Sequence, residues 1–123
     1  MAITLALGCG TDNPDVVPVS GTVTRNGKPV PNVEVYFQPS QGRPSYAVTD
    51  AQGKFELGYT REQNGALIGN HTVYITYLSP EGGADAPPPP ELREILDKYG
   101  TPEKSPLKVE IKGREDNLPI KLD

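Results

Sequence analysis

The sequence predicts an all-β fold, a seven-stranded antiparallel sandwich with one short helix near residues 91–99. Two strand–turn–strand signatures carry this prediction. The first spans 21–33 and places Asn26-Gly27 between two stretches of alternating polarity, and both residues tolerate the positive φ of a two-residue hairpin turn. The second spans 49–57 around the turn 50–53, whose aspartate can accept from backbone amides and whose glycine supplies positive φ.

Seven stretches alternate apolar and polar residues with period two, as strands with one buried face do. They are 17–25, 33–38, 45–49, 55–59, 71–77, 107–111 and 118–122. We expect loops at 39–44 and 60–70 and a turn at 113–117. Pro119 is expected at an outward or edge position, because proline cannot donate to a ladder of hydrogen bonds.

One segment carries the period of a helix rather than a strand. Its apolar residues recur at helical spacing: Leu92, Ile95, Leu96 and Tyr99. Gly100 is a stop signal, so we expect a helix that covers an open sheet edge or an end of the sandwich, with partner binding as the alternative. The preceding segment, 79–90, is rich in glycine and proline and is the best candidate for contact with a partner or the cell wall; a plain loop is its alternative.

Length and charge limit the class of protein. The 123 residues fit one domain. Twelve basic residues oppose 16 acidic ones, for a net charge of −4, and binding to a nucleic-acid backbone needs a concentrated basic surface. No nucleic-acid partner is therefore expected. A single cysteine excludes an intrachain disulfide, so the core must supply the stability.

The N-terminus is the one strongly apolar stretch. Residues 1–10 resemble the end of a bacterial lipoprotein signal peptide, with Cys9 as the residue that would receive the lipid. The stretch departs from that pattern, because Leu5 stands one place too far from Cys9 and no basic region precedes it. Two alternatives remain, a frayed apolar tail and a first strand in which Cys9 is a small apolar residue.

Several motifs follow one another in a recognisable order. They are Gly21-Thr22-Val23, Gly27-Lys28-Pro29 through Val33, Thr49-Asp50 through Gly53 and Phe55, the stretch 65–73, Lys98-Tyr99, Ser105-Pro106-Leu107 and Val109-Glu110-Ile111. Together they resemble the carboxypeptidase regulatory-like domain, a transthyretin-like (prealbumin-like) β-sandwich, as found in small lipoproteins of planctomycete-type bacteria. The resemblance covers 5–123. It implies a Greek-key sandwich in an exported, membrane-anchored protein, with no established catalytic residues to carry over.

The residues offer little for catalysis. His71 is the only histidine and lies on the inward face of a predicted strand, so we expect it to be packed and hydrogen-bonded. One histidine is too few for the transthyretin-like hydroxyisourate hydrolases, which need several and a C-terminal Tyr-Arg-Gly-Ser, and for the intradiol dioxygenases, whose iron takes two histidines and two tyrosines. A Ser-His-Asp triad is open on residue types alone, but nothing resembles a nucleophile elbow. We expect no enzyme activity, no catalytic or metal-binding residue and no cofactor.

Three further patterns have a functional and a plain interpretation. Asp50 with Asp12 and Asp15 has the oxygen ligands of a calcium site, but turn chemistry explains Asp50 without a metal. The sequon at Asn70 is expected to be incidental. Outward-facing Tyr36 and Tyr74 are suited to a carbohydrate-stacking surface, although exposed cross-strand tyrosines also occur without a ligand.

These observations predict a signal remnant and tether over 1–15 and a transthyretin-like domain over 16–123. We expect a non-enzymatic, lipid-anchored protein of the bacterial cell envelope, facing the periplasm or the exterior, with a structural or adhesion-type binding role. Its expected partners are the membrane, through a lipid on Cys9, and an envelope protein or glycan. The alternative is a carbohydrate- or peptide-binding accessory domain that serves a separate enzyme or transporter.

Overall fold

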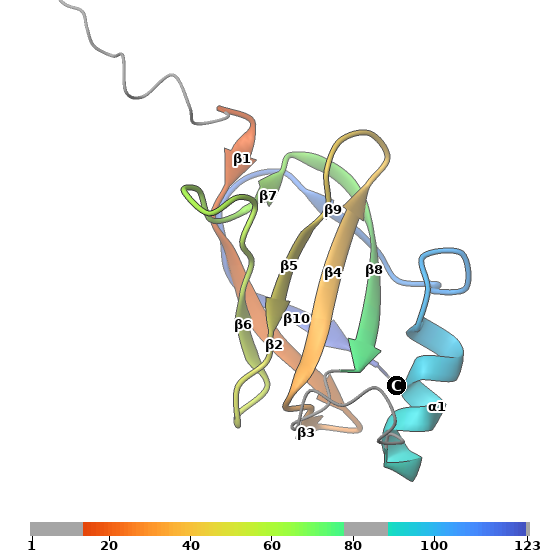
Figure 1. The fold of residues 1–123 in the computed structure, drawn as a ribbon. Helices are drawn as coiled ribbons and strands as arrows, with labels where there is room; N and C mark the ends of the chain where they lie inside the picture. The colour runs from red at the N-terminus through yellow and green to blue at the C-terminus, as the bar shows by residue number, and fades with distance from the viewer. Residues whose placement is uncertain (1–13, 78–88, 123) are drawn as a thin grey trace, which may run out of the picture.

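The computed structural model describes residues 14–77 and 89–122, which form short strands and one helix (Figure 1). In chain order the elements are β1 (Val16–Val17), β2 (Val19–Arg25), β3 (Lys28–Pro29), β4 (Val33–Pro39), β5 (Ser45–Val48), β6 (Lys54–Glu56), β7 (Ala66–Leu67), β8 (Gly69–Tyr77), α1 (Pro90–Tyr99), β9 (Lys108–Ile111) and β10 (Glu115–Lys121). The prediction of a mostly β chain with one short helix is confirmed.

Two four-stranded sheets form the layers of a sandwich (Figure 1). The first, which we call the β4–β8 sheet, has the order β5-β4-β8-β9 and is antiparallel throughout. The second, the β2–β10 sheet, has the order β10-β2-β3, and β6 also pairs with β2. Phe37 of β4 and Phe55 of β6 meet between the layers, with ring centroids 6.2 Å apart. A two-stranded ribbon of β1 and β7 completes the strands of the described residues.

The core lies between the two sheets, where alternate residues of each strand point inward. On β4 these are Val33, Val35 and Phe37, each at most 1% exposed, as the period-two pattern predicts. Val73 and Ile75 of β8 are fully buried beside them. Each such side chain contributes about 1.5–3 kcal/mol when it leaves water, so a core of this kind can stabilise the fold without a disulfide.

The pairing of β10 with β2 is parallel, which corrects the prediction that every pair is antiparallel. In this pair Gly21 lies opposite Leu118. A Cβ atom at Gly21 would lie 1.9 Å from the carbonyl oxygen of Leu118, so only glycine fits there. Period-two polarity carries no information about strand direction, and the sequence therefore could not show this pairing. Pro119 is exposed on β10, an edge strand, as predicted.

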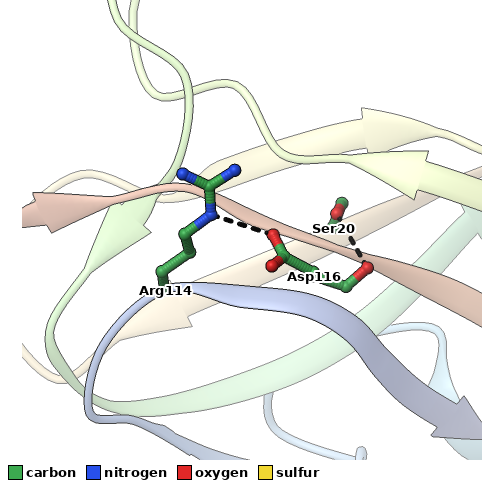
Figure 2. A network of polar contacts seen from close by, with 3 residues as sticks. All are labelled: Ser20, Arg114 and Asp116. Carbon is green, nitrogen blue, oxygen red and sulfur yellow. Dashed lines mark hydrogen bonds and ion pairs between the residues drawn. The ribbon is translucent and has the colours of Figure 1, made fainter.

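The strand β10 also begins earlier than predicted, at Glu115 rather than at 118. Its early part is held by contacts from outside the strand. The amide of Glu115 donates to the carbonyl of Pro18 at 3.0 Å. Figure 2 shows Asp116 between Ser20, whose hydroxyl donates to the Asp116 carbonyl at 3.2 Å, and Arg114, whose Nε lies 3.0 Å from Asp116 Oδ1. The register then shifts before Leu118, which is the mark of a β-bulge.

Other boundaries were also predicted wrongly. The predicted strand 17–25 is divided at Pro18, because β1 pairs with β7 whereas β2 pairs in the β2–β10 sheet. The predicted loop 60–70 contains β7 and the first residues of β8. The predicted strand 55–59 ends at Glu56. Each difference arises from pairing between residues distant in sequence, which local patterns do not record.

The two predicted turns have the expected backbone. Asn26 and Gly27 have φ of 53° and 81°, and the short strand β3 completes their hairpin with β2. Gly53 has φ of 77°, as the turn 50–53 requires. The Asp50 Oδ1 accepts from the amides of Gln52 and Lys54, both at 2.9 Å.

The helix α1 lies alongside the second half of β8 (Figure 1). β9 pairs with β8 only from Gly69 to Thr72. One more hydrogen bond, from the Val73 amide to the Leu107 carbonyl at 2.9 Å, follows the last paired residues. The helix α1 packs against the part of β8 with which β9 no longer pairs. A salt bridge of 2.6 Å ties Glu94 of α1 to Arg25 of β2. No helix within the described ranges is both long enough and apolar enough to cross a membrane.

Candidate functional site

Three tyrosines stack in a row on the outer face of the β4–β8 sheet. Tyr36 of β4 lies directly opposite Tyr46 of β5 and Tyr74 of β8. Its ring centroid is 5.3 Å from that of Tyr46 and 5.0 Å from that of Tyr74, with interplanar angles of 16° and 8°. We call this row the tyrosine ladder. Because the rings cover part of one another's faces, their edges and hydroxyl groups are what a ligand would meet.

Two hydroxyls of the ladder, those of Tyr36 and Tyr74, hold their protons more tightly than an ordinary tyrosine does. Partial burial is the main cause that raises the pKa of Tyr36 above its ordinary 10.0, followed by the charge of the Glu34 carboxylate. Partial burial also raises the pKa of Tyr74, and the carboxylate of Glu103 adds to the effect. Tyr46 is 50% exposed at the outer end of the row. Tyr36 and Tyr74 therefore offer neutral hydroxyl groups, which can both donate and accept hydrogen bonds.

A carboxylate lies at one side of the ladder. Glu34 lies two residues before Tyr36 on the same face of β4, and the Thr76 hydroxyl donates to Glu34 Oε1 at 2.7 Å. Val48, 43% exposed, lies opposite Glu34 on β5. The bond from Thr76 therefore holds a negative charge beside the central ring of the ladder.

A hollow of about 470 Å³ lies on the other side of the ladder. Its polar lining comes from β4, β8, β9 and the loop after β4: Gln38, Ser40, Asn70, His71, Thr72, Lys108 and Glu110. Gln38 and Thr72 are opposite each other, one step along the same face from Tyr36 and Tyr74. The Lys108 Nζ donates to the Thr72 hydroxyl at 2.9 Å. The ladder and this hollow therefore form one continuous surface, which we call the outer face.

The side chains of the outer face can form hydrogen bonds with a polar ligand. Amide and hydroxyl side chains can donate and accept at the same time, and the charges of Lys108 and Glu110 offset each other. Within the residues that the structure describes, no three His, Cys, Asp or Glu side chains are grouped so that they could hold a metal ion.

His71 belongs to the core. It is 2% exposed, its Nε2 lies 2.7 Å from the Leu67 carbonyl, and its ring centroid is 5.7 Å from that of Phe37. Its Nδ1 is buried without a hydrogen-bond partner among the described residues. The prediction of a packed, hydrogen-bonded histidine is confirmed through Nε2.

The structure also places other residues singled out in the sequence. The Asp50 side chain accepts from the backbone amides of Gln52 and Lys54, as turn chemistry requires. The backbone carbonyl of Asp15 accepts from Ile68 at 2.8 Å. Asn70 is exposed beside the hollow. Cys9, Asp12 and 79–88 lie outside the described residues.

A second hollow, of about 530 Å³, lies between the β2–β3 hairpin and α1. Arg25 and Glu94 contribute to its lining, together with Tyr77, Leu92 and Ile95. Arg25 and Glu94 are paired with each other at 2.6 Å. The β2–β3 hairpin and the residues after it add further polar lining, from Asn26, Lys28 and Asn32.

Part of the chain matches a known family model. Residues 19–76 match a family described as a domain of unknown function (DUF6795), and the match spans just under half of the 123-residue chain. All three residues of the tyrosine ladder lie within it, whereas Lys108 and Glu110 lie beyond it. Neither the curated proteins nor the solved structures contain a match to the chain.

The sequence predicted two of the three ladder residues and none of the hollow. Tyr36 and Tyr74 were expected on the outward face, and they lie there. Tyr46 was missed, although alternation within 45–49 places it outward, because its position opposite Tyr36 depends on the register of β4 and β5. The hollow was missed because its residues come from three strands and a loop that are far apart in sequence.

Proposed function

We propose that the protein is a non-enzymatic binding module of the bacterial cell envelope, lipid-anchored and facing the periplasm or the exterior, with a structural or adhesion-type role. The outer face is the observation that carries this proposal. It combines a row of stacked aromatic rings with a hollow that several amide, hydroxyl and charged side chains line, and aromatic residues are enriched at protein surfaces that recognise partners.

We also assign the domain, residues 16–123, to the carboxypeptidase regulatory-like, transthyretin-like class, with a seven-stranded Greek-key topology. Seven of the strands are three residues or longer, and β1, β3 and β7 are two-residue additions. At two glycines of the motifs the structure has no room for a Cβ atom. A Cβ at Gly21 would collide with the backbone of β10, and one at Gly53, where φ is 77°, would lie 2.6 Å from the Val23 carbonyl oxygen.

A lipid anchor at the N-terminus would fix where in the cell the protein is found. Cys9 would carry a diacylglyceryl group, and the polar residues up to 15 would link it to the domain. The first described strand, β1, begins at Val16, where the proposed domain begins. The membrane is thus one proposed partner, and an envelope protein or glycan is the other.

The absence of catalysis is proposed from the position of the titratable groups. His71 is the one histidine of the chain, and although it lies against the hollow it is only 2% exposed and its ring packs against Phe37. A general base must reach the proton that it abstracts, and a buried ring next to a phenyl group is poorly placed to do so.

A second candidate function is a carbohydrate- or peptide-binding accessory domain that serves a separate enzyme or transporter. The observation that favours it is the hollow, which has a defined volume and polar groups from four segments. An adhesion role alone needs a surface but no such hollow.

Expression of the native gene in a bacterial host tests the anchor. Mass spectrometry of the membrane fraction should find the diacylglyceryl group on Cys9, and Cys9→Ser should move the protein to the soluble fraction. Thr11→Ser is the matched control and should stay in the membrane. Unmodified Cys9 on a soluble protein would overturn the address.

A further inference from the structure

We propose that the outer face binds an uncharged oligosaccharide, which lies in the hollow with one edge against the tyrosine ladder. The inference rests on the proposed role as a binding module and names the class of ligand. Four kinds of observation carry it: the hydrogen-bonding groups of the hollow, its balance of charge, the position of the site within the sheet, and the ladder at its rim.

The hydrogen-bonding groups match a ligand with many hydroxyls. Asn70 presents an amide oxygen and an amide NH₂ group, and Thr72 presents a hydroxyl. Gln38 presents an amide oxygen, while its Nε2 already donates to the Pro39 carbonyl at 3.2 Å. Every sugar hydroxyl is both a donor and an acceptor, so groups of mixed character satisfy it best. Ser40 adds a further hydroxyl from the loop after β4.

The balance of charge favours an uncharged ligand. Lys108 and Glu110 are the two charged residues of the hollow, with one charge of each sign. Lys108 already donates to Thr72 at 2.9 Å, which holds its ammonium group at the wall. The chain carries a net charge of −4, so a polyanion would be repelled by the rest of the molecule.

The position of the site within the sheet favours a glycan over an extended peptide. Peptides that bind to sheets pair their backbone with a free strand edge. Gln38 and Asn70 lie instead on strands that are already paired: β4 lies between β5 and β8, and the first part of β8 lies between β4 and β9. Recognition on this face therefore depends on side chains, which is how a protein contacts a sugar.

The tyrosine ladder supplies a rigid rim. Tyr36 and Tyr74 form one cross-strand pair of the outer face, and Gln38 and Thr72 form the next pair on the same face. The two pairs lie side by side across β4 and β8. The three hydroxyls of the ladder extend the row of donors and acceptors, and the ring edges give apolar contact for the C–H groups of a pyranose. Stacking fixes the rings before binding, so little side-chain freedom is lost on contact.

The test uses the full chain, made in bacteria, on an array of uncharged oligosaccharides, with sulfated and uronic oligosaccharides and proline-rich peptides on the same array. We expect saturable binding to a subset of the uncharged glycans. By isothermal titration with the tightest of these, Asn70→Ala and Gln38→Ala should each weaken binding about tenfold or more, as loss of a buried hydrogen bond does. Asn117→Ala, an exposed amide on β10 of the opposite sheet, is the matched control and should bind like the native protein.

Thermal unfolding of each variant shows whether it folds. If Asn70→Ala does not, Lys108→Ala on β9 tests the same hollow, with Lys121→Ala on β10 as its control. Three results would each overturn the assignment. They are no binding to any uncharged glycan, a preference for the sulfated glycans or the peptides, and equal binding by the hollow variants and the control variants. The binding experiment does not depend on Cys9. A failure to bind glycans would therefore not contradict the proposed lipid anchor, which the membrane-fraction experiment tests separately.

Discussion

Tyr36 and Tyr74 stack across β4 and β8 with their ring centroids 5.0 Å apart and their planes 8° from parallel. The stack exists because the register sets the two residues directly opposite each other. The same register points Val35 and Val73 into the core. A slip of one residue would exchange the two faces, burying the tyrosines and exposing the valines. The burial of the core therefore fixes the geometry of the outer face.

Removal of the central ring should destabilise the sheet. Tyr36→Ala ends both stacks, and since each aromatic pair contributes about 0.5–1.5 kcal/mol, we expect a loss of about 1–3 kcal/mol in the free energy of unfolding. Tyr36→Phe keeps the ring and should lose less than half as much. Urea denaturation measures both. Equal losses for the two variants would show that the hydroxyl, rather than the stack, provides the stability.

The stability should fall at alkaline pH. Burial raises the folded-state pKa of Tyr36 and Tyr74 above 10.0, the ordinary value that applies to the unfolded chain. The folded state then holds its protons more tightly, so this contribution is fully present below pH 10.0 and is lost as the pH rises through the folded-state pKa. Urea midpoints at increasing pH measure the fall.

A matched variant isolates the two tyrosines in that experiment. Tyr36→Phe/Tyr74→Phe removes both titrating groups and keeps both rings, so its stability should fall less steeply above pH 10.0. Identical slopes for the native and double-variant proteins would contradict the assigned shifts.

The parallel pairing of β10 with β2 predicts a severe effect at one glycine. Gly21→Ala places a Cβ atom 1.9 Å from the Leu118 carbonyl oxygen, so β10 must move, and we expect a loss of about 3 kcal/mol or more. Gly113→Ala is the control, because a Cβ there meets nothing within 4 Å and should change stability by about 0.5 kcal/mol at most. Similar melting temperatures for the two variants would rule out the close approach of β10.

Asp50 distinguishes turn chemistry from calcium binding. Asp50→Ala frees the amides of Gln52 and Lys54, and we expect a loss of about 1–2 kcal/mol. Asp50→Asn keeps an oxygen acceptor and should retain most of the stability. Thermal unfolding with calcium and with a chelator should give the same midpoint for the native protein. A midpoint that falls on chelation would restore the calcium interpretation.

Features that depend on neighbours in sequence could be predicted, and those that depend on distant pairing could not. The turns at Asn26-Gly27 and 50–53 follow from the backbone preferences of a few adjacent residues, and the alternation of β4 and β8 follows from burial of one face. The parallel direction of β10 and the strand β7 depend on partners far along the chain. No local pattern encodes those partners.

The outer face shows the same division. Outward positions for Tyr36 and Tyr74 follow from alternation within each strand. That Tyr46 joins them, and that Gln38 meets Thr72 beside Lys108, depends on the registers of three strand pairs. The sequence could therefore indicate an aromatic surface, but the hollow next to it required the assembled sheet.

The most direct test of the outer face follows the backbone amide resonances of the labelled full chain while the tightest uncharged oligosaccharide of the array is added. We predict that the shifts concentrate on β4, β8 and β9, at Gln38, Asn70, Thr72 and the tyrosine ladder, with the β2–β10 sheet unchanged. Shifts that concentrate on β2, β6 and β10, or around the hollow next to α1, would contradict the assignment of the outer face as the binding surface.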